Sequence, residues 1–396
     1  MIRSYRFPLR PTKAQSRDLG TMLSAHRFLW NRCLSMRQLA WDFKCSVTYS
    51  EQSSWFKTER GTNNWFRAME FTSAQATMRR LDRSFKAFFA GCKGTGPKRG
   101  HPKFKRPDEL DSVEFPKVGS GIQLSKDLRR AKIRWVGRVR LHAYRDIKGE
   151  VRTLRIKREG TKWFLIVCCD VGEPVGEPSL NPAVGIDVGL ESFATLSNGE
   201  QVPNPRFLKA ALPALRRASR TLERRTRRDK DRRVFGRQSR RRDRAKAALR
   251  RIHGKVRNQR SDFVHKVSRD LVRRFGTIAV ERLQISNMLG SHRLARSISD
   301  AAWRRCLEAT RYKSEESLVA FAEVDPRGTS QLCSGCGLKV PKGLSVRLHQ
   351  CPHCGLVLHR DVNAARNILS RALARTAPAG PNREVLDSGA PGSPRL

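Results

Sequence analysis

Three carboxylates stand where predicted backbone elements start or end. Asp187 lies in a short strand whose apolar residues at 184, 186 and 188 predict one buried face and turn Asp187 to the other. Glu281 closes a second apolar strand, 277–283, and Asp361 opens a predicted helix, 360–369. Each residue alone also has an ordinary explanation, because a strand-end Asp commonly bonds to a turn and an acidic residue at a helix start offsets the helix dipole.

As a set, these carboxylates supply the hard oxygen ligands that Mg²⁺ prefers. Two such ions held against a phosphodiester stabilise both the attacking and the leaving oxygen. We therefore interpret Asp187, Glu281 and Asp361 as candidate catalytic residues and candidate Mg²⁺ ligands.

Four cysteines form two Cys-x2-Cys pairs, each followed by a glycine that lets the backbone wrap around the sulfurs: Cys333, Cys336, Cys351 and Cys354. This spacing predicts a structural zinc site, since four thiolates leave no open position for catalysis. The other six cysteines show no pairing pattern, which favours a reducing compartment. His349, His353 and His359 flank the pairs and are interpreted as surface or nucleic-acid contacts rather than ligands.

The composition implies a polyanionic partner. Lys and Arg number 81 against 36 Asp and Glu, a formal net charge of +45 whose self-repulsion opposes compaction. The density peaks in 206–260, where 23 basic residues face four acidic ones along a thin apolar thread. This pattern predicts a long basic helical hairpin, whose like charges need phosphates as counterions. No apolar run reaches the roughly 18 residues of a membrane span, and the first residues do not read as a signal peptide, so we expect a cytoplasmic, nucleoid-associated protein without a membrane partner.

The remaining segments indicate several domains. An alternation at residues 1–9 predicts a strand that Pro8 would confine to a sheet edge or end, and a helical region follows to about residue 90. Within that region, Trp30, Trp41, Trp55 and Trp65 are assigned to the core rather than to base stacking. The loop 91–106 is either a contact to a nucleic-acid backbone or a solvated linker.

Short strands from residue 113 to about 171 predict a small barrel. The strand that carries Asp187 is expected to continue through Leu196, turn at Asn198-Gly199 and pair with a strand near Gln201. A helical pattern at 263–275 could then cross over to the strand that ends at Glu281.

The motifs GIDVG, VERL and RDVNAA, with the four-cysteine segment between the second and third, resemble the TnpB family of transposon-encoded RNA-guided nucleases, relatives of type V CRISPR effectors. Asp187, Glu281 and Asp361 match the three catalytic acids of that family. The resemblance implies a multidomain α+β fold: a wedge β-barrel with an inserted helical domain, an RNase H-like (RuvC) α/β nuclease domain, and a zinc ribbon. It places the wedge barrel at 1–10 and 108–176, the helical recognition domain at 11–107, the split nuclease domain at 177–326 and 357–376, and the zinc ribbon at 327–356. The Pro- and Gly-rich composition of 377–396 predicts a disordered tail.

The resemblance further implies an RNA-guided, Mg²⁺-dependent endodeoxyribonuclease that cuts a guide-matched double-stranded DNA target beside a short flanking motif. Its partners would be that DNA and a guide RNA encoded beside the gene, with one protein per RNA. Two alternatives remain open. A nuclease-inactive RNA-guided regulator is disfavoured by the intact acids, and a DNA-joining transposase is disfavoured by the zinc ribbon between the second and third acids.

Overall fold

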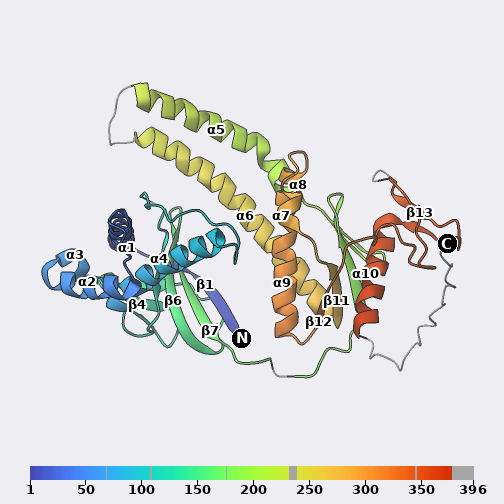
Figure 1. Cartoon of the computed structure of the whole chain (residues 1–396), viewed down its shortest axis with the longest axis horizontal. Coiled ribbons are helices and arrows are strands. Elements are labelled where there is room, and N and C mark those ends of the chain that lie inside the picture. The colour runs from blue at the N-terminus through green and yellow to red at the C-terminus, as the bar shows by residue number, and fades with distance from the viewer. Residues whose placement is uncertain (68, 108, 175, 232–238, 344–345, 377–396) are drawn as a thin grey trace, which may run out of the picture. The chain divides into compact units, whose positions relative to one another are not determined.

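The computed structural model describes residues 1–67, 69–107, 109–174, 176–231, 239–343 and 346–376. The predicted disordered tail, 377–396, and the tip of the predicted hairpin, 232–238, lie outside these residues. The chain forms two compact units, Met1–Glu173 and Pro174–Leu396, each with its own core (Figure 1). Within the described part of the chain, none of the helices is long and apolar enough to cross a membrane.

The helices of the first unit begin at side-chain caps. The side chains of Thr12 and Thr48 each accept a hydrogen bond from the backbone N–H three residues on. The side chains of Gln15 and Glu51 in turn accept one from the backbone N–H of the threonine, which completes two capping boxes. The elements are α1 (Lys13–Asp42), α2 (Tyr49–Thr62), α3 (Asn64–Arg67) and α4 (Phe71–Cys92). The helical prediction to about residue 90 is therefore confirmed.

The core assignment of the four tryptophans is half right. Trp30 is buried and Trp55 packs against the core, as predicted, whereas Trp41 and Trp65 are 71% and 54% exposed. Trp41 lies in the last turn of α1, beyond the buried residues of that helix, the last of which is Leu34.

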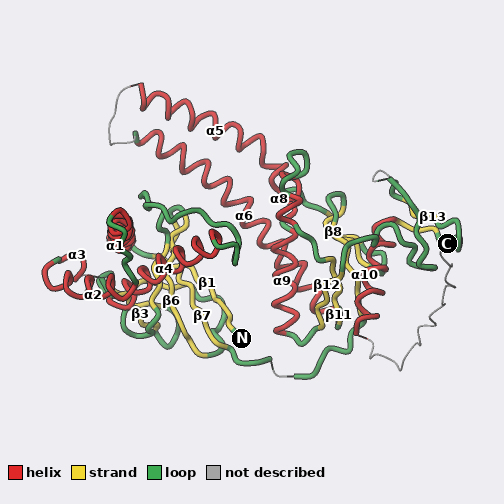
Figure 2. The backbone as a smooth tube through the Cα atoms, in the orientation of Figure 1, coloured by secondary structure: helices red, strands yellow, loops and turns green. Residues whose placement is uncertain are grey.

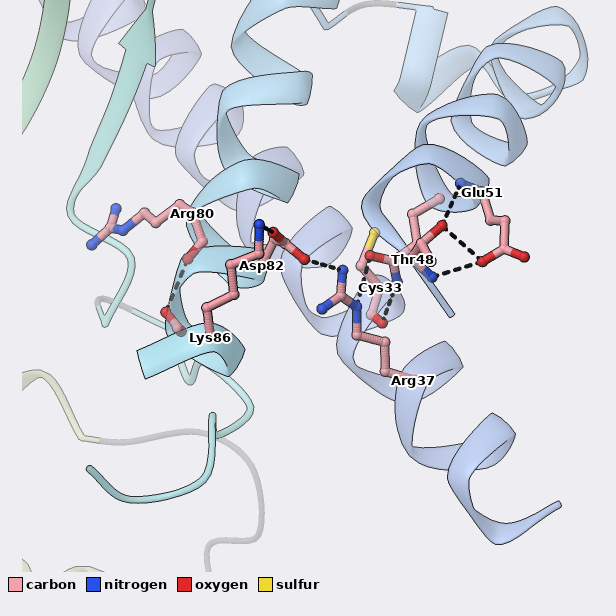
Figure 3. Close-up of polar contacts among 9 residues, drawn as sticks. Cys33, Arg37, Thr48, Glu51, Arg80, Asp82 and Lys86 are labelled. Carbon is pink, nitrogen blue, oxygen red and sulfur yellow. Dashed lines mark hydrogen bonds and ion pairs between the residues drawn. The ribbon is translucent and has the colours of Figure 1, made fainter. Parts of the chain in front are cut away.

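Arg37 ties three of these helices together (Figure 3). Its guanidinium donates to Gln52 Oε1 of α2 at 3.1 Å and to Asp82 Oδ1 of α4 at 3.0 Å. Lys86 pairs with the same Asp82 carboxylate at 3.2 Å, and Gln52 Nε2 donates to the carbonyl of Cys33 at 2.7 Å. Because these polar groups are satisfied at the helix junction, they fix how the three helices pack.

A seven-stranded sheet completes the first unit, in the order β2-β6-β7-β1-β5-β4-β3. Its strands are β1 (Ile2–Arg10), β2 (Ser112–Phe115), β3 (Ile122–Leu124), β4 (Arg130–Ile133), β5 (Gly137–Leu141), β6 (Glu150–Glu159) and β7 (Lys162–Asp170). The Phe115 ring of β2 packs on Gly121, just before β3, so the sheet is nearly closed. No ladder joins these two strands within the described residues, which distinguishes this sheet from a fully hydrogen-bonded barrel.

The prediction that Pro8 keeps the first strand at an edge is wrong. β1 lies between β7 and β5, and it pairs with β7 from Ile2 to Leu9. Its ladder with β5 comprises only Leu9 and Arg10, so it starts after the proline, where backbone N–H groups are available again.

The second unit is built on a five-stranded mixed sheet, in the order β10-β9-β8-β11-β12. Its strands are β8 (Ala183–Val188), β9 (Ser192–Leu196), β10 (Gln201–Pro203), β11 (Thr277–Glu281) and β12 (Ala320–Val324), of which β8, β11 and β12 run parallel. The expectation of one strand through Leu196 is wrong, because the chain already reverses at 189–191 and β9 pairs antiparallel with β8. The second turn at Asn198-Gly199 and the strand from Gln201 occur as predicted.

Helices cover both faces of this sheet (Figure 2). α6 (Arg240–Arg274) and α9 (Trp303–Glu316) pack on the face that holds Ile186, Ile278 and Val280, while α10 (Arg360–Thr376) packs on the face that holds Ala279. The pattern at 263–275, predicted as a possible crossover helix, is the C-terminal part of α6 itself.

α5 (Phe207–Asp231) and α6 lie side by side as a long hairpin, in agreement with the prediction for 206–260 (Figure 1). The buried Asp300 of α8 (Ala295–Ala301) fixes its base. Asp300 accepts from the backbone N–H groups of Leu208 and Lys209 and from the Arg260 guanidinium of α6 at 2.7 Å. A short helix, α7 (Ile285–Met288), lies between β11 and α8 in the sequence. The cysteine segment forms a hairpin of β13 (Leu348–Gln350) and β14 (Val357–His359).

Candidate nuclease and zinc sites

Asp187 and Glu281 lie on the same face of the five-stranded sheet. Val280 pairs with Ile186 in parallel register, and the two acids are the next residues on their strands. Ile186 and Val280 belong to the core on the α6 and α9 side, so alternation places both carboxylates on the α10 side.

Asp361 reaches this face because α10 packs unusually close to β8. At Gly185 an added Cβ would lie 2.0 Å from the carbonyl oxygen of Ala365 and 2.8 Å from the amide nitrogen of Leu369. Only glycine allows this contact between helix and strand. Since Asp361 lies in the first turn of α10, the same contact brings the third carboxylate beside the other two.

The three predicted acids are therefore brought together, and the charges of Glu281 and Asp361 act on the protonation of Asp187. Burial, followed by the Glu281 and Asp361 carboxylates, raises the pKa of Asp187 well above its usual range, against the opposing charge of Arg360. Burial also raises the pKa of Glu281, although a hydrogen bond from Thr329 and the charge of Arg371 act in the other direction. Three neighbouring carboxylates, two of them with raised pKa values, are a donor set suited to hard divalent cations.

Two basic residues approach Asp361 from the cysteine segment. Arg347 Nη1 and His359 Nδ1 each lie 4.0 Å from Asp361 Oδ2, and Arg347 also pairs with Glu191 at 2.9 Å. His359, interpreted from the sequence as a surface or nucleic-acid contact, thus neighbours the acid cluster. Sequence reasoning missed Arg347, because nothing in its local pattern relates it to a carboxylate 14 positions away.

The four predicted cysteines converge. Their sulfur atoms all lie within 4.8 Å of one another, and the pairs Cys333–Cys354 and Cys336–Cys351 are each 3.6 Å apart. A tetrahedral zinc with Zn–S bonds of about 2.3 Å requires sulfurs about 3.8 Å apart, so the cluster fits this ion. Gly337 and Gly355, which follow the pairs, have φ of +75° and +71°, as the backbone wrap predicted for them requires.

Cations line two further surfaces. Along the α5 and α6 hairpin, exposed basic side chains outnumber buried apolar ones. The exposed basic residues include Arg216, Arg217, Arg220, Arg224, Arg241, Arg244 and Lys255. In the first unit, a cavity of about 630 Å³ is lined by basic residues that include Arg80, Arg83, Arg99, Lys103 and Lys105.

The loop beside that cavity is rigidly held. The Asn31 side chain accepts from the Lys105 N–H at 2.8 Å and donates to the Lys105 carbonyl at 3.0 Å, while Trp30 Nε1 donates to the Lys103 carbonyl at 3.2 Å. These bonds disfavour the interpretation of 91–106 as a solvated linker, and its contact to a nucleic-acid backbone stays a prediction.

Three family models match the chain. They are described as "Probable transposase" at residues 166–292, "Cas12f1-like, TNB domain" at 303–368 and "Helix-turn-helix domain" at 1–43. The last description differs from the fold, since residues 2–42 form one strand and one long helix.

Two similar relatives extend over almost the whole chain. A "Putative RNA-guided DNA endonuclease" of Streptomyces pristinaespiralis is 32% identical, over 95% of this chain and 90% of its own. The "Putative RNA-guided DNA endonuclease InsQ" of Escherichia coli K12 is 26% identical, over 98% and 96%. Among solved structures, a Cas12f1 complex with sgRNA and target DNA aligns over 93% of this chain and 99% of its own, at 14% identity and a TM-score of 0.35.

Proposed function

Because the chain belongs to the TnpB family, we propose that it is an RNA-guided DNA endonuclease of a transposable element. It hydrolyses phosphodiester bonds in double-stranded DNA, at a target that matches its guide RNA and adjoins a short flanking motif. The observation that carries the proposal is the gathering of Asp187, Glu281 and Asp361 on one face of the sheet, in a chain 32% identical to a relative named for this activity.

The chemistry proposed for the acid cluster is hydrolysis assisted by Mg²⁺. Bound there, two such ions would stabilise charge on the attacking and leaving oxygens. Asp187 and Asp361 would hold the ions, and Glu281 would complete the ligand set and orient the attacking water. The buried surroundings strengthen each of these electrostatic contacts relative to water.

The zinc cluster has a structural role. With zinc bound, Cys333, Cys336, Cys351 and Cys354 would supply four thiolate ligands and would hold the segment between β12 and α10 in one conformation. We assign this segment, 327–356, to a zinc ribbon inserted in a RuvC-like nuclease domain of 177–326 and 357–376. Residues 1–10 and 108–176 are assigned to the wedge and 11–107 to the recognition domain.

Guide RNA and target DNA are the partners that the charge distribution favours. The exposed cations of the α5 and α6 hairpin and of the cavity in the first unit offer phosphate contacts that do not depend on sequence. Base pairing with a guide then supplies the selectivity. We propose that one protein binds one RNA, transcribed beside its own gene, and acts at the nucleoid.

The test is to purify the protein with its RNA, sequence that RNA, and replace its guide segment. Cutting should move to a DNA that matches the new guide and keeps the flanking motif, and it should require Mg²⁺. Asp187→Ala should reduce cutting by orders of magnitude and leave RNA retention nearly unchanged, because Asp187 faces the acid cluster rather than the basic surfaces. Cutting that ignores the guide, or survives Asp187→Ala, would refute the proposal.

The description "Probable transposase" motivates one other candidate, DNA strand transfer. Carboxylate clusters on related sheets also support that reaction. The same assay distinguishes the two, since joined DNA products appear only with strand transfer, whereas hydrolysis alone leaves every cut end unjoined.

A further inference from the structure

One stripe of α10 is a row of polar side chains spaced four residues apart. Asn363, Asn367, Arg371 and Arg375 all donate to backbone carbonyls of a single segment, 323–332, which runs from the end of β12 to the residue before the first cysteine pair. Residues four apart share one helix face, so the stripe forms a continuous clamp along that segment.

The two asparagines grip the end of the segment nearest the cysteines. Asn363 Nδ2 donates to the Leu332 carbonyl at 2.7 Å, and Asn363 Oδ1 accepts from the Ser334 N–H at 2.8 Å, between the first two zinc ligands. Asn367 Nδ2 donates to the carbonyls of Thr329 and Leu332 at 2.8 and 2.7 Å. Both amides are buried, so losing any of these partners would leave an unsatisfied polar group.

Thr329, in the middle of the clamped segment, contacts the acid cluster directly. Its hydroxyl donates to Glu281 Oε1 at 2.5 Å, and the residue is only 3% exposed. The clamp therefore fixes the backbone of Thr329, and Thr329 in turn fixes one oxygen of Glu281. The second oxygen of that carboxylate stays available for a metal ion.

We propose that Thr329 is a positioning residue that holds Glu281 in its metal-binding orientation, and that Asn363 and Asn367 hold Thr329 in register with the zinc site. The zinc ribbon and the acid cluster are then structurally coupled. The zinc, which contacts no reacting group, would help to fix the orientation of the Glu281 carboxylate through Thr329. Hydrogen-bonded partners of metal ligands commonly change metal affinity by about 10- to 100-fold when removed.

This inference rests on the proposed function, but its test does not need a guide or a target. The full-length chain is stripped of nucleic acid in high salt, and Mn²⁺, which prefers the same oxygen ligands as Mg²⁺, is titrated while free Mn²⁺ is followed by electron paramagnetic resonance. Asp187→Ala defines the binding that does not involve the acid cluster. Zinc content is measured on every sample.

Thr329→Val removes the hydroxyl at nearly constant volume and should weaken Mn²⁺ binding by about tenfold or more, with zinc retained. Thr329→Ser should bind as the wild type, because it keeps the donor. Thr310→Val is the matched control: Thr310 is a buried threonine of the same unit whose hydroxyl bonds to Cys306 of its own helix, so Mn²⁺ affinity should not change. Should the valine variant fail to fold, Thr329→Cys, a much weaker donor of similar size, replaces it.

Asn367→Leu tests the clamp. It should weaken Mn²⁺ binding in the same direction as Thr329→Val, although the Asn367 side chain donates to the backbone carbonyls of Thr329 and Leu332 and not to Glu281. Wild-type Mn²⁺ affinity in Thr329→Val or in Asn367→Leu would overturn the proposal. An acid cluster that binds Mn²⁺ as predicted in a protein that never cuts DNA would instead refute the proposed function and leave this inference standing.

Discussion

At the scale of single residues, the ionised carboxylates that metal binding requires lower the stability of the metal-free fold. The pKa of Asp187 is raised because burial and two neighbouring carboxylates disfavour its charge. Without a divalent ion, the folded state therefore bears the cost of keeping this group ionised near neutral pH.

Asp187→Asn should accordingly stabilise the metal-free protein. We expect a gain of about 1 kcal/mol, which for a unit of roughly 200 residues corresponds to about 2 to 4 °C in Tm. Calorimetry of both proteins in chelator and in Mg²⁺ measures it. Added Mg²⁺ should raise the Tm of the wild type more than that of the variant; a variant that melts below the wild type in chelator contradicts the prediction.

His26 predicts a pH dependence in the other unit. It is buried between Thr77 and Ser73, and burial lowers its pKa to about 3. Because the folded pKa is depressed, His26 costs no stability above the unfolded pKa of about 6.5, and stability is lost as pH falls from there toward 3. At most about 1.4 kcal/mol is lost per pH unit, or about 2 kcal/mol by pH 5.

Denaturant titrations followed by tryptophan fluorescence can measure this loss, since every tryptophan except Trp303 lies in the first unit. His26→Gln keeps a donor and an acceptor but cannot titrate, so its stability should fall less between pH 6.5 and 5. Equal pH slopes for the two proteins would show that His26 is not the titrating group.

At this scale the sequence predicts which residues can bind metal, but it does not predict which other residues contact them in the folded chain. The three acids and four cysteines were found because carboxylate and thiolate spacing carries their chemistry. Thr329 and Arg347 were missed because each meets its carboxylate only after folding, across 48 and 14 positions. The spacing of Asn363 and Asn367 was visible, but a polar stripe on a helix ordinarily faces water.

At the scale of elements, the contact between α10 and β8 positions the site. Gly185→Ala would place a methyl group 2.0 Å from the Ala365 carbonyl oxygen, so α10 must move away from β8. We expect a loss of about 3 kcal/mol and weaker Mn²⁺ binding, because Asp361 moves with the helix. Gly254→Ala in α6 is the control, since nothing lies within 4 Å of its added Cβ.

That control should be stabilised by up to about 1 kcal/mol, as alanine favours a helix over glycine. Thermal melts and Mn²⁺ titration of the two variants provide the comparison. A Gly185→Ala protein with wild-type stability would mean that α10 and β8 are not in this close contact.

The zinc site makes a prediction at the same scale. Metal analysis should find about one zinc per chain, and Cys351→Ser should lose it together with the protection of the backbone around β13 and β14 from hydrogen exchange. Asp187→Ala should keep its zinc, because Asp187 is not among the cysteine ligands. Full zinc occupancy in Cys351→Ser would exclude the four-thiolate site.

Elements were predicted well where a local pattern of apolar residues, charges or turn residues identifies them, and poorly where that local signal is missing or distant strands decide. The helices of the first unit, the basic hairpin and the short strands from residue 113 were recognised. The turn at 189–191 was missed because Gly-Leu-Glu lacks the usual signal of a tight hairpin, whereas Asn198-Gly199 has it. The place of β1 inside its sheet depends on β5 and β7, more than 120 positions away, which local sequence does not specify.

At the scale of the whole molecule, a net charge of +45 sets how the protein meets nucleic acid. Affinity should fall steeply with salt, since each phosphate contact releases a counterion. Arg216→Glu, Arg220→Glu and Arg224→Glu together reverse one stripe of α5 and should weaken RNA retention and flatten this salt dependence. Filter binding across a salt series measures both.

The control reverses three exposed lysines outside the hairpin, Lys117, Lys126 and Lys132, so that the net charge changes equally. Its RNA retention should fall less. Equal losses in both triple variants would show that total charge, and not the hairpin, retains the RNA.

The repulsion that the Glu281 and Asp361 carboxylates exert on Asp187 also has a consequence for how the protein evolves. The scaffold around the three carboxylates is held by Gly185, by the asparagine stripe and by the cysteines, and none of these contacts needs Asp187 to be an acid. A lineage that lost Asp187 would therefore keep its fold and its basic surfaces, and would gain stability with the same mutation. Drift alone would then turn a cutting protein into one that only binds, so the persistence of all three acids in a gene would record continued selection for the cut itself.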